Sequence, residues 1–144
     1  MKSTITLSAA LIVAGLAVVL WPEQDQEARA SADAPSTGAP LADVILPDTL
    51  SQNAQIGQRA YEVNCAACHG ANAAGQEGVA PPLVHKIYEP GHHGDESFQR
   101  AAAMGVQAHH WRFGDMPPVE GITRADVSFI IAYIRELQRA NGIN

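Results

Sequence analysis

Cysteine, aromatic and basic residues are all scarce in this chain of 144 residues. Two cysteines cannot build a disulfide framework, so any thiol chemistry rests on the single pair Cys65 and Cys68. Phe, Trp and Tyr make up only 6% of the chain, so a small domain must gain core volume from something else, such as an embedded cofactor. With a net charge of −6 and no basic run, the chain has no electrostatic basis for binding nucleic acid.

The longest apolar run, from Ile5 to Trp21, lies close behind Lys2 at the N-terminus. It is longer than a typical signal-peptide core of about 7–15 residues and just long enough to span a membrane as a helix. A small-residue cleavage motif at 28–30 lies well beyond the end of the run. We therefore expect residues 1–21 to be a signal-anchor or transmembrane segment, with a removed signal peptide as the alternative. Both place the rest of the chain on the periplasmic side of the cytoplasmic membrane.

Residues 22–50 differ in composition from the C-terminal part of the chain, being rich in Ala, Pro, Ser and acidic side chains. Such a segment buries too little apolar surface to offset the entropy of ordering it, which predicts a flexible acidic tether. The folded domain is then expected over residues 51–144.

Helical periodicity is clear within that domain, whereas no stretch alternates well enough for a strand. A first helix is expected over residues 51–64, with Ile56, Ala60 and Val63 at helical spacing. The last helix is the clearest element, because a capping box precedes an apolar stripe at positions i, i+3, i+4, i+7 and i+10. The capping residues are Thr123 and Asp126, and the stripe consists of Val127, Ile130, Ile131, Ile134 and Leu137.

A shorter helix is predicted from Asp95 to Gly105, and we expect Met104 within it to fill the core. Long loops rich in Gly and Pro connect these helices. Short helices joined by long loops make a poor core unless something is packed between them, which again favours a bound cofactor.

The motif that decides among cofactors is Cys65-Ala-Ala-Cys68-His69. A C-x-x-C pair alone fits a redox dithiol, half of a zinc site or a disulfide, and the histidine adds covalent attachment of a c-type haem. A zinc site lacks a second cysteine pair, and a thioredoxin-like dithiol lacks a preceding strand. On one helical turn the two thiols can bond both haem vinyl groups while His69 binds the iron, so the motif predicts one haem c.

The second iron ligand has to come from elsewhere in the chain. Met116 lies in a loop stiffened by Pro117 and Pro118, which can hold a weak thioether ligand with little loss of entropy. We therefore expect Met116 to be that ligand, with a histidine as the alternative.

Together these features resemble a class I, mono-haem c-type cytochrome over nearly all of residues 51–144. Gly57 and Tyr61 are similar to the small and aromatic residues of that family's first helix, which crosses the last helix near Tyr133. The resemblance implies an all-α cytochrome c fold, with short helices and long loops wrapped around one covalently attached haem.

The stretch Ala80-Pro81-Pro82-Leu83 is similar to the family's G-P-x-L motif, with alanine in place of glycine. By that resemblance the carbonyl of Pro81 accepts a hydrogen bond from the ring of His69, and Leu83 packs on the haem. The implied function is one-electron transfer, without catalysis, between a redox protein donor and acceptor. We expect a monomer or a subunit of a redox complex, held to the membrane by its N-terminal segment.

Two histidine pairs, His92-His93 and His109-His110, are not explained by the family resemblance. We expect polar loop residues at the haem edge, hydrogen-bonding the propionates together with Trp111 or Arg112. Two alternatives remain open: a second, His-rich metal site, and a haem enzyme or gas sensor whose methionine ligand leaves the iron.

Overall fold

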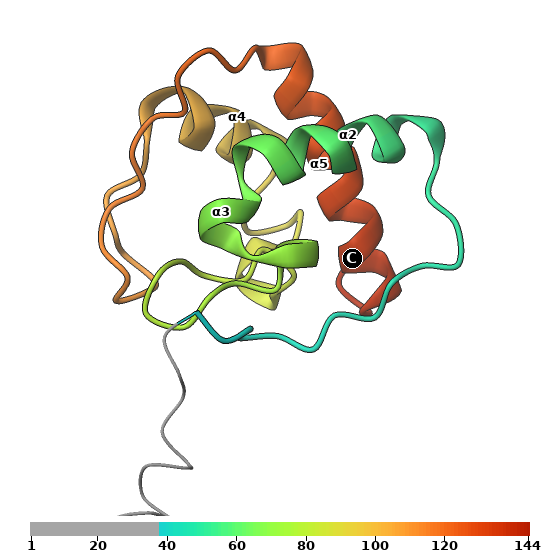
Figure 1. Cartoon of the computed structure of the whole chain (residues 1–144), viewed down its shortest axis with the longest axis horizontal. Coiled ribbons are helices and arrows are strands. Elements are labelled where there is room, and N and C mark those ends of the chain that lie inside the picture. The colour runs from blue at the N-terminus through green and yellow to red at the C-terminus, as the bar shows by residue number, and fades with distance from the viewer. Residues whose placement is uncertain (1–37) are drawn as a thin grey trace, which may run out of the picture. The chain divides into compact units, whose positions relative to one another are not determined.

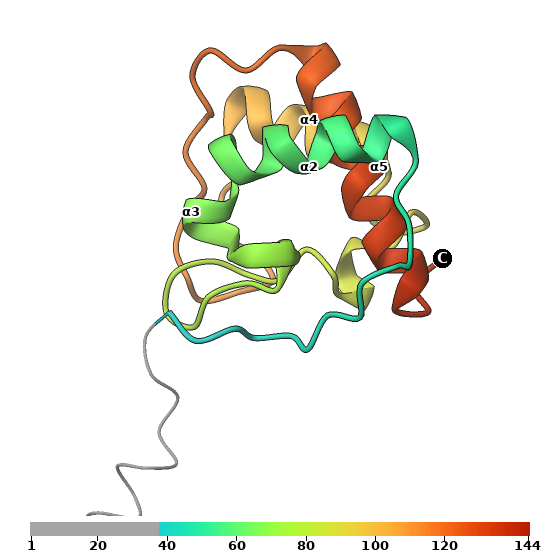
Figure 2. The ribbon, with the colours of Figure 1, turned by 45° about the vertical axis from the view of Figure 1, so that its right-hand side comes forward.

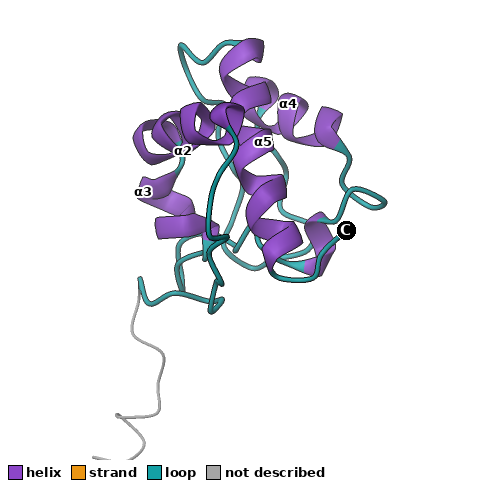
Figure 3. Cartoon of the chain, turned by 90° about the vertical axis from the view of Figure 1, so that its right-hand side faces the viewer, coloured by secondary structure: helices purple, strands orange, loops and turns teal. Residues whose placement is uncertain are grey.

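A computed structural model describes residues 38–144 of the chain. Helices and loops make up this part, and between residues 38 and 144 there is no strand, only two isolated bridges (Figure 3). The prediction of an all-α fold is therefore confirmed. The helices are α2 (Gln52–Asn64), α3 (Ala66–His69), α4 (Asp95–Met104) and α5 (Arg124–Ala140), with 3₁₀ turns η1 (Ala71–Ala73) and η2 (Lys86–Tyr88).

Helices α2 and α5 begin where the sequence predicts. The side chain of Ser51 caps α2 by accepting a hydrogen bond from the amide of Ala54. Thr123 and Asp126 form the predicted capping box of α5, each side chain accepting from the other's backbone amide. All five residues of the predicted apolar stripe on α5 are buried.

The crossing of α2 over α5 forms the centre of the fold (Figures 1 and 2). A Cβ on Gly57 would lie 1.8 Å from the backbone oxygen of Phe129, so only glycine allows the two helices this close. One turn later, the rings of Tyr61 and Tyr133 pack at 5.6 Å between centroids, and both are buried. The crossing that the family resemblance implied is therefore present.

The predicted apolar face of α2 is only partly correct. Val63 is 82% exposed, and Ile56 and Ala60 are half-buried. The residues that α2 buries are Ala54, Gly57 and Tyr61. Close approach to α5 requires small side chains at the crossing. A periodicity of large apolar residues does not reveal such small buried positions, so the sequence predicted the face of α2 only in part.

Helix α4 has nearly the predicted bounds, with Gly94 rather than Asp95 at its N-cap and Gly105 at its C-cap. The expectation that Met104 fills the core is wrong, because its side chain is 67% exposed. Met104 is the last residue of α4, where the helix opens toward a cavity instead of packing on α5.

Residues 38–50 lie against the domain, which differs from the predicted tether. The amides of Leu41 and Ala42 both donate to the carbonyl of Ala74, and Val44 and Leu50 pack against the core. Ile45 and Asn141 exchange two hydrogen bonds, of 2.9 and 2.8 Å. Backbone groups and two apolar side chains thus hold a segment whose composition alone predicts no order.

The remaining predictions for the N-terminus, a tether over residues 22–37 and an anchor or signal peptide over residues 1–21, lie outside the described residues. Between residues 38 and 144, none of the helices has the length and apolar character needed to cross a membrane.

Candidate haem site

Cys65 is the C-cap of α2, and Cys68 lies in α3 on the next turn of backbone. Figure 1 shows α3 following directly on α2. The amides of Cys68 and His69 both donate to the carbonyl of Cys65, at 3.1 and 2.9 Å. The two thiols are free and line the same cavity. Before haem is attached, burial, with a smaller effect of Cys68, raises the pKa of Cys65 to about 11, so at neutral pH this thiol is protonated in the haem-free chain.

His69 is buried, with 9% of its surface exposed. Its Nδ1 lies 2.9 Å from the carbonyl oxygen of Pro81, which can only accept, so Nδ1 carries the proton. The hydrogen bond implied by the family resemblance is present. It leaves Nε2 as a free electron-pair donor on the side of the cavity. Burial lowers the pKa of His69, although the bond to Pro81 acts in the opposite direction, and the neutral ring is the form that binds a metal.

The loop that carries Pro81 is held from both ends. The amides of Leu83 and Val84 donate to the carbonyl of Ala73. Ala80, at the position of the family's glycine, is buried and pairs with Gln76 through two backbone hydrogen bonds. Its φ is not in the left-handed region, so alanine is accommodated there without strain.

A cavity of about 790 Å³ lies between these elements. This volume is within the range of small-molecule and cofactor pockets. All six predicted haem-site residues line it: Cys65, Cys68, His69, Pro81, Leu83 and Met116. The sequence places them up to 51 positions apart, and the fold brings them to one site.

Met116 is carried by residues 105–118, the Met116 loop, which is drawn in orange in Figure 1. Val106 and Met116 exchange two backbone hydrogen bonds of 2.9 Å, which close the base of the loop. Gly105 has a φ of 75° and packs so tightly that a Cβ would lie 2.4 Å from the oxygen of Met116. These backbone contacts restrain Met116 in addition to the two prolines that come directly after it.

Trp111, on the same loop, has a buried indole N–H without a hydrogen bond of good geometry, and it is the one such side-chain atom found within residues 38–144. The hydroxyl of Tyr88 lies near this N–H but is not placed to form a full hydrogen bond. The ring of Trp111 packs against His85 and Phe113, with centroids 5.1 and 5.9 Å away, and it lines the cavity. A buried donor without a partner indicates an acceptor supplied by a bound group. A haem carboxylate fits this requirement, and the two thiols, the oriented imidazole and the apolar walls fit the rest of a haem.

The four histidines of the two pairs also converge on the cavity wall. Five of the six pairs among their rings have centroids 4.3 to 6.2 Å apart. His85 packs separately on Trp111. Desolvation and the neighbouring imidazoles lower the pKa of His110. Sequence patterns identified the pairs but gave no sign that they meet.

The family model for cytochrome c matches residues 54–138, more than half of the chain. The chain belongs to the cytochrome c family. No curated protein matched it. As a member of that family, this cytochrome binds haem c covalently, and Cys65 and Cys68 fit the attachment motif. Proteins of this family are in general haem-based electron carriers that interact with redox partners.

Both methionines of the domain that could reach iron line the cavity of this cytochrome. Met104 is the last residue of α4 and is mostly exposed, whereas Met116 is half-buried in the Met116 loop, whose base is closed by backbone hydrogen bonds. Sequence reasoning missed the Val106–Met116 pairing and the unpartnered N–H of Trp111, because both depend on contacts that form only in the folded chain.

Proposed function

We propose that this cytochrome is a one-electron carrier, not an enzyme, whose haem iron is ligated by His69 and Met116. The observation that carries the proposal is the placement of both side chains on one cavity. Nε2 of His69 is free on one side, and the Met116 loop is pinned by its own backbone. When bound, the haem supplies an iron that cycles between two oxidation states.

The role of the protein is to keep the iron ligands in place in both oxidation states. The Pro81 carbonyl fixes the tautomer and orientation of His69 and raises its basicity as a ligand. The restrained Met116 loop limits how far the second ligand can move. Small rearrangement on electron transfer favours rapid exchange with redox partners, and the process requires no acid or base from the protein.

The first test is an absorption spectrum of the holoprotein, oxidised and then reduced. We expect a reduced c-type spectrum, and in the oxidised form a weak far-red iron–sulfur charge-transfer band. Met116→Ala should abolish that band, whereas the matched control Met104→Ala should keep it. Loss of the band in Met104→Ala alone would contradict the assignment. Rapid binding of CO to the reduced wild-type protein would indicate an open iron and favour an enzyme or gas sensor.

We also propose that the cytochrome works on the periplasmic side of the cytoplasmic membrane, anchored by residues 1–21. The support is the apolar run itself and the position of the cleavage motif far beyond it. Mass spectrometry of the mature chain, with fractionation of membranes, tests this. An intact N-terminus in the membrane fraction is expected, and a chain that begins after residue 30 would contradict the anchor.

A further inference from the structure

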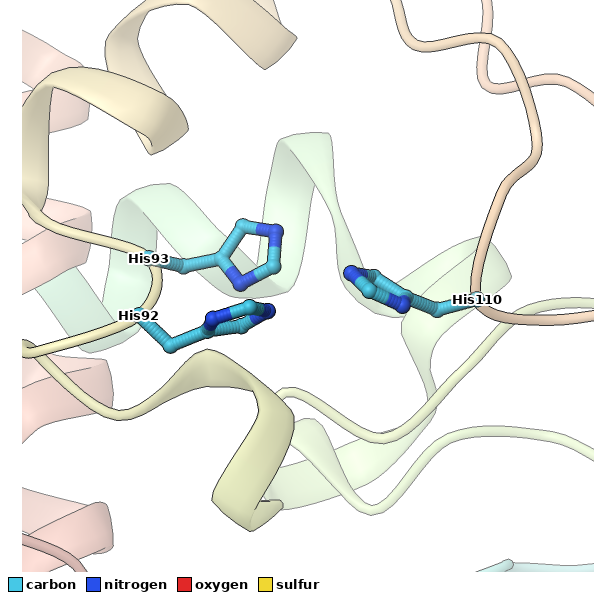
Figure 4. A group of neighbouring side chains, drawn as sticks. All are labelled: His92, His93 and His110. Carbon is cyan, nitrogen blue, oxygen red and sulfur yellow. The ribbon is translucent and has the colours of Figure 1, made fainter.

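His92, His93 and His110 bring ligand atoms together on the cavity wall, outside the set of residues that accounts for the haem. One ring nitrogen from each lies within 4.8 Å of the other two. In Figure 4 the adjacent His92 and His93 face His110, which reaches toward them from the Met116 loop. We propose that these three histidines form a second metal site, which takes a divalent first-row transition metal ion such as Zn²⁺ or Cu²⁺.

The backbone of the His92-His93 turn is fixed by contacts from two directions. The amides of both residues donate to the carbonyl of Glu89, at 3.0 and 2.8 Å. From α5, the buried guanidinium of Arg135 donates to the carbonyl of His93 at 2.6 Å. The backbone that carries two of the three ligands is thus fixed before any ion arrives, which reduces the entropy lost on binding.

The tautomer of His93 is also set for coordination. Its Nδ1 lies 2.6 Å from the carbonyl oxygen of Ile87, so Nδ1 carries the proton and donates it. Nε2 is left as the electron-pair donor. A ligating histidine whose other nitrogen donates to a backbone carbonyl is the usual arrangement at protein metal sites.

The site can close onto an ion with small side-chain movements. Zn–N bonds of about 2.0–2.1 Å in a tetrahedral site require ligand nitrogens about 3.4 Å apart. His92 and His110 are exposed, so rotation of their rings can shorten the present separations. Their exposure also gives the ion a path from solvent.

The chemistry of the ligand set restricts the class of ion. Imidazole suits Zn²⁺, Cu²⁺ and Ni²⁺, whereas Mg²⁺ and Ca²⁺ prefer oxygen ligands. Three histidines leave a coordination position open for water or for a group from another molecule. A bound ion joins the turn before α4 to the Met116 loop, two segments whose histidine rings already pack against each other.

Equilibrium dialysis of the holoprotein against buffered Zn²⁺, with metal analysis of the retained protein, tests the site. Zn²⁺ is the probe because it has no redox chemistry with the haem. We expect one zinc per haem iron, and at least a tenfold loss of affinity in His92→Gln, His93→Gln and His110→Gln. The matched control is His109→Gln. Its ring is 4.3 Å from that of His110, but its nitrogens lie outside the three-residue group, so it should bind within about twofold of wild type.

The haem spectrum and the melting temperature of each variant show whether the fold is intact. Unchanged values in a variant that has lost zinc support the site and separate it from the proposed electron transfer. Absence of zinc from the intact wild-type holoprotein overturns the proposal, as does equal binding by all four variants or an equal loss in His109→Gln. Loss of the far-red band in all three ligand variants also overturns it, because these histidines would then support the Met116–iron bond rather than hold a separate ion.

Discussion

Replacing Gly57 by alanine tests the close crossing of α2 and α5. The added Cβ would lie 1.8 Å from the oxygen of Phe129, whereas real Cβ contacts essentially never fall below 3.0 Å. The helices must therefore separate by about 1.2 Å along this contact. The position of the Cβ is fixed by the backbone of α2, and the atoms that it meets are backbone atoms of α5, so no side-chain rotation can relieve the overlap.

A gap of that size weakens the buried contacts on either side of the crossing. A gap of 0.5–1 Å between two packed atoms already loses about a quarter to a half of their dispersion energy. The Tyr61–Tyr133 pair stabilises the crossing by about 0.5–1.5 kcal/mol beyond its buried area. Overpacking costs about 1–3 kcal/mol where neighbours can adjust, and the better helix propensity of alanine returns about 1 kcal/mol. Together these contributions give an expected net loss of about 2 kcal/mol, which lowers the melting temperature by about 10 °C for a domain of this size.

Thermal unfolding of the holoprotein, followed by far-ultraviolet circular dichroism, measures the effect. Gly91→Ala is the matched control, because a Cβ at Gly91 meets nothing within 4 Å and its φ is not left-handed. This variant should unfold within about 0.5 kcal/mol of wild type. If Gly57→Ala melted within a few degrees of the control, the reasoning about the crossing would be refuted.

Three further predictions concern buried polar groups. Arg135→Met removes a buried guanidinium that donates hydrogen bonds to Asp95 and to the carbonyls of Tyr88 and His93. The free energy of unfolding, measured in urea, should fall by about 3 kcal/mol. A loss under about 1 kcal/mol would contradict this. Tyr61→Phe removes the buried 2.8 Å hydrogen bond to the carbonyl of Gly70 and should cost about 1–2 kcal/mol in the same assay, with the haem spectrum unchanged. Burial lowers the pKa of the His69 ring in the folded chain, and in the holoprotein a proton on Nε2 also competes with the iron. The unfolded chain therefore binds more protons below about pH 6.5, so the contribution of His69 to the free energy of unfolding should be full above that pH and be lost as the pH falls through the lower, folded pKa. Urea unfolding between neutral pH and about pH 5 measures this, and stability that rises in acid would refute it.

Local patterns were enough to predict the elements whose determinants are themselves local. The capping box of α5 and its apolar stripe depend on spacings within one helix, and the haem-attachment motif lies within five consecutive residues. The face of α2 could not be predicted in the same way, because α5 selects Ala54 and Gly57 for their small size.

Long-range contacts account for the other differences. Met104 lies in an apolar stretch, but α4 ends there and the side chain opens toward the cavity. Residues 38–50 are ordered by the carbonyl of Ala74 and by the side chain of Asn141, and the composition of the segment reveals neither. The meeting of the two histidine pairs depends on a turn and a loop that the sequence separates by 16 residues or more.

The pairing of Ile45 with Asn141 also bears on the order in which the domain folds. These residues are 96 positions apart, so their two hydrogen bonds close a loop that includes nearly the whole domain. Such a contact forms late, since the C-terminal end of α5 must already be in place to receive it. In native-state hydrogen exchange, the amide of Ile45 should therefore open at lower free energy than the amides at the helix crossing. We therefore expect residues 38–50 to join the folded domain last and to be the first part to open on unfolding.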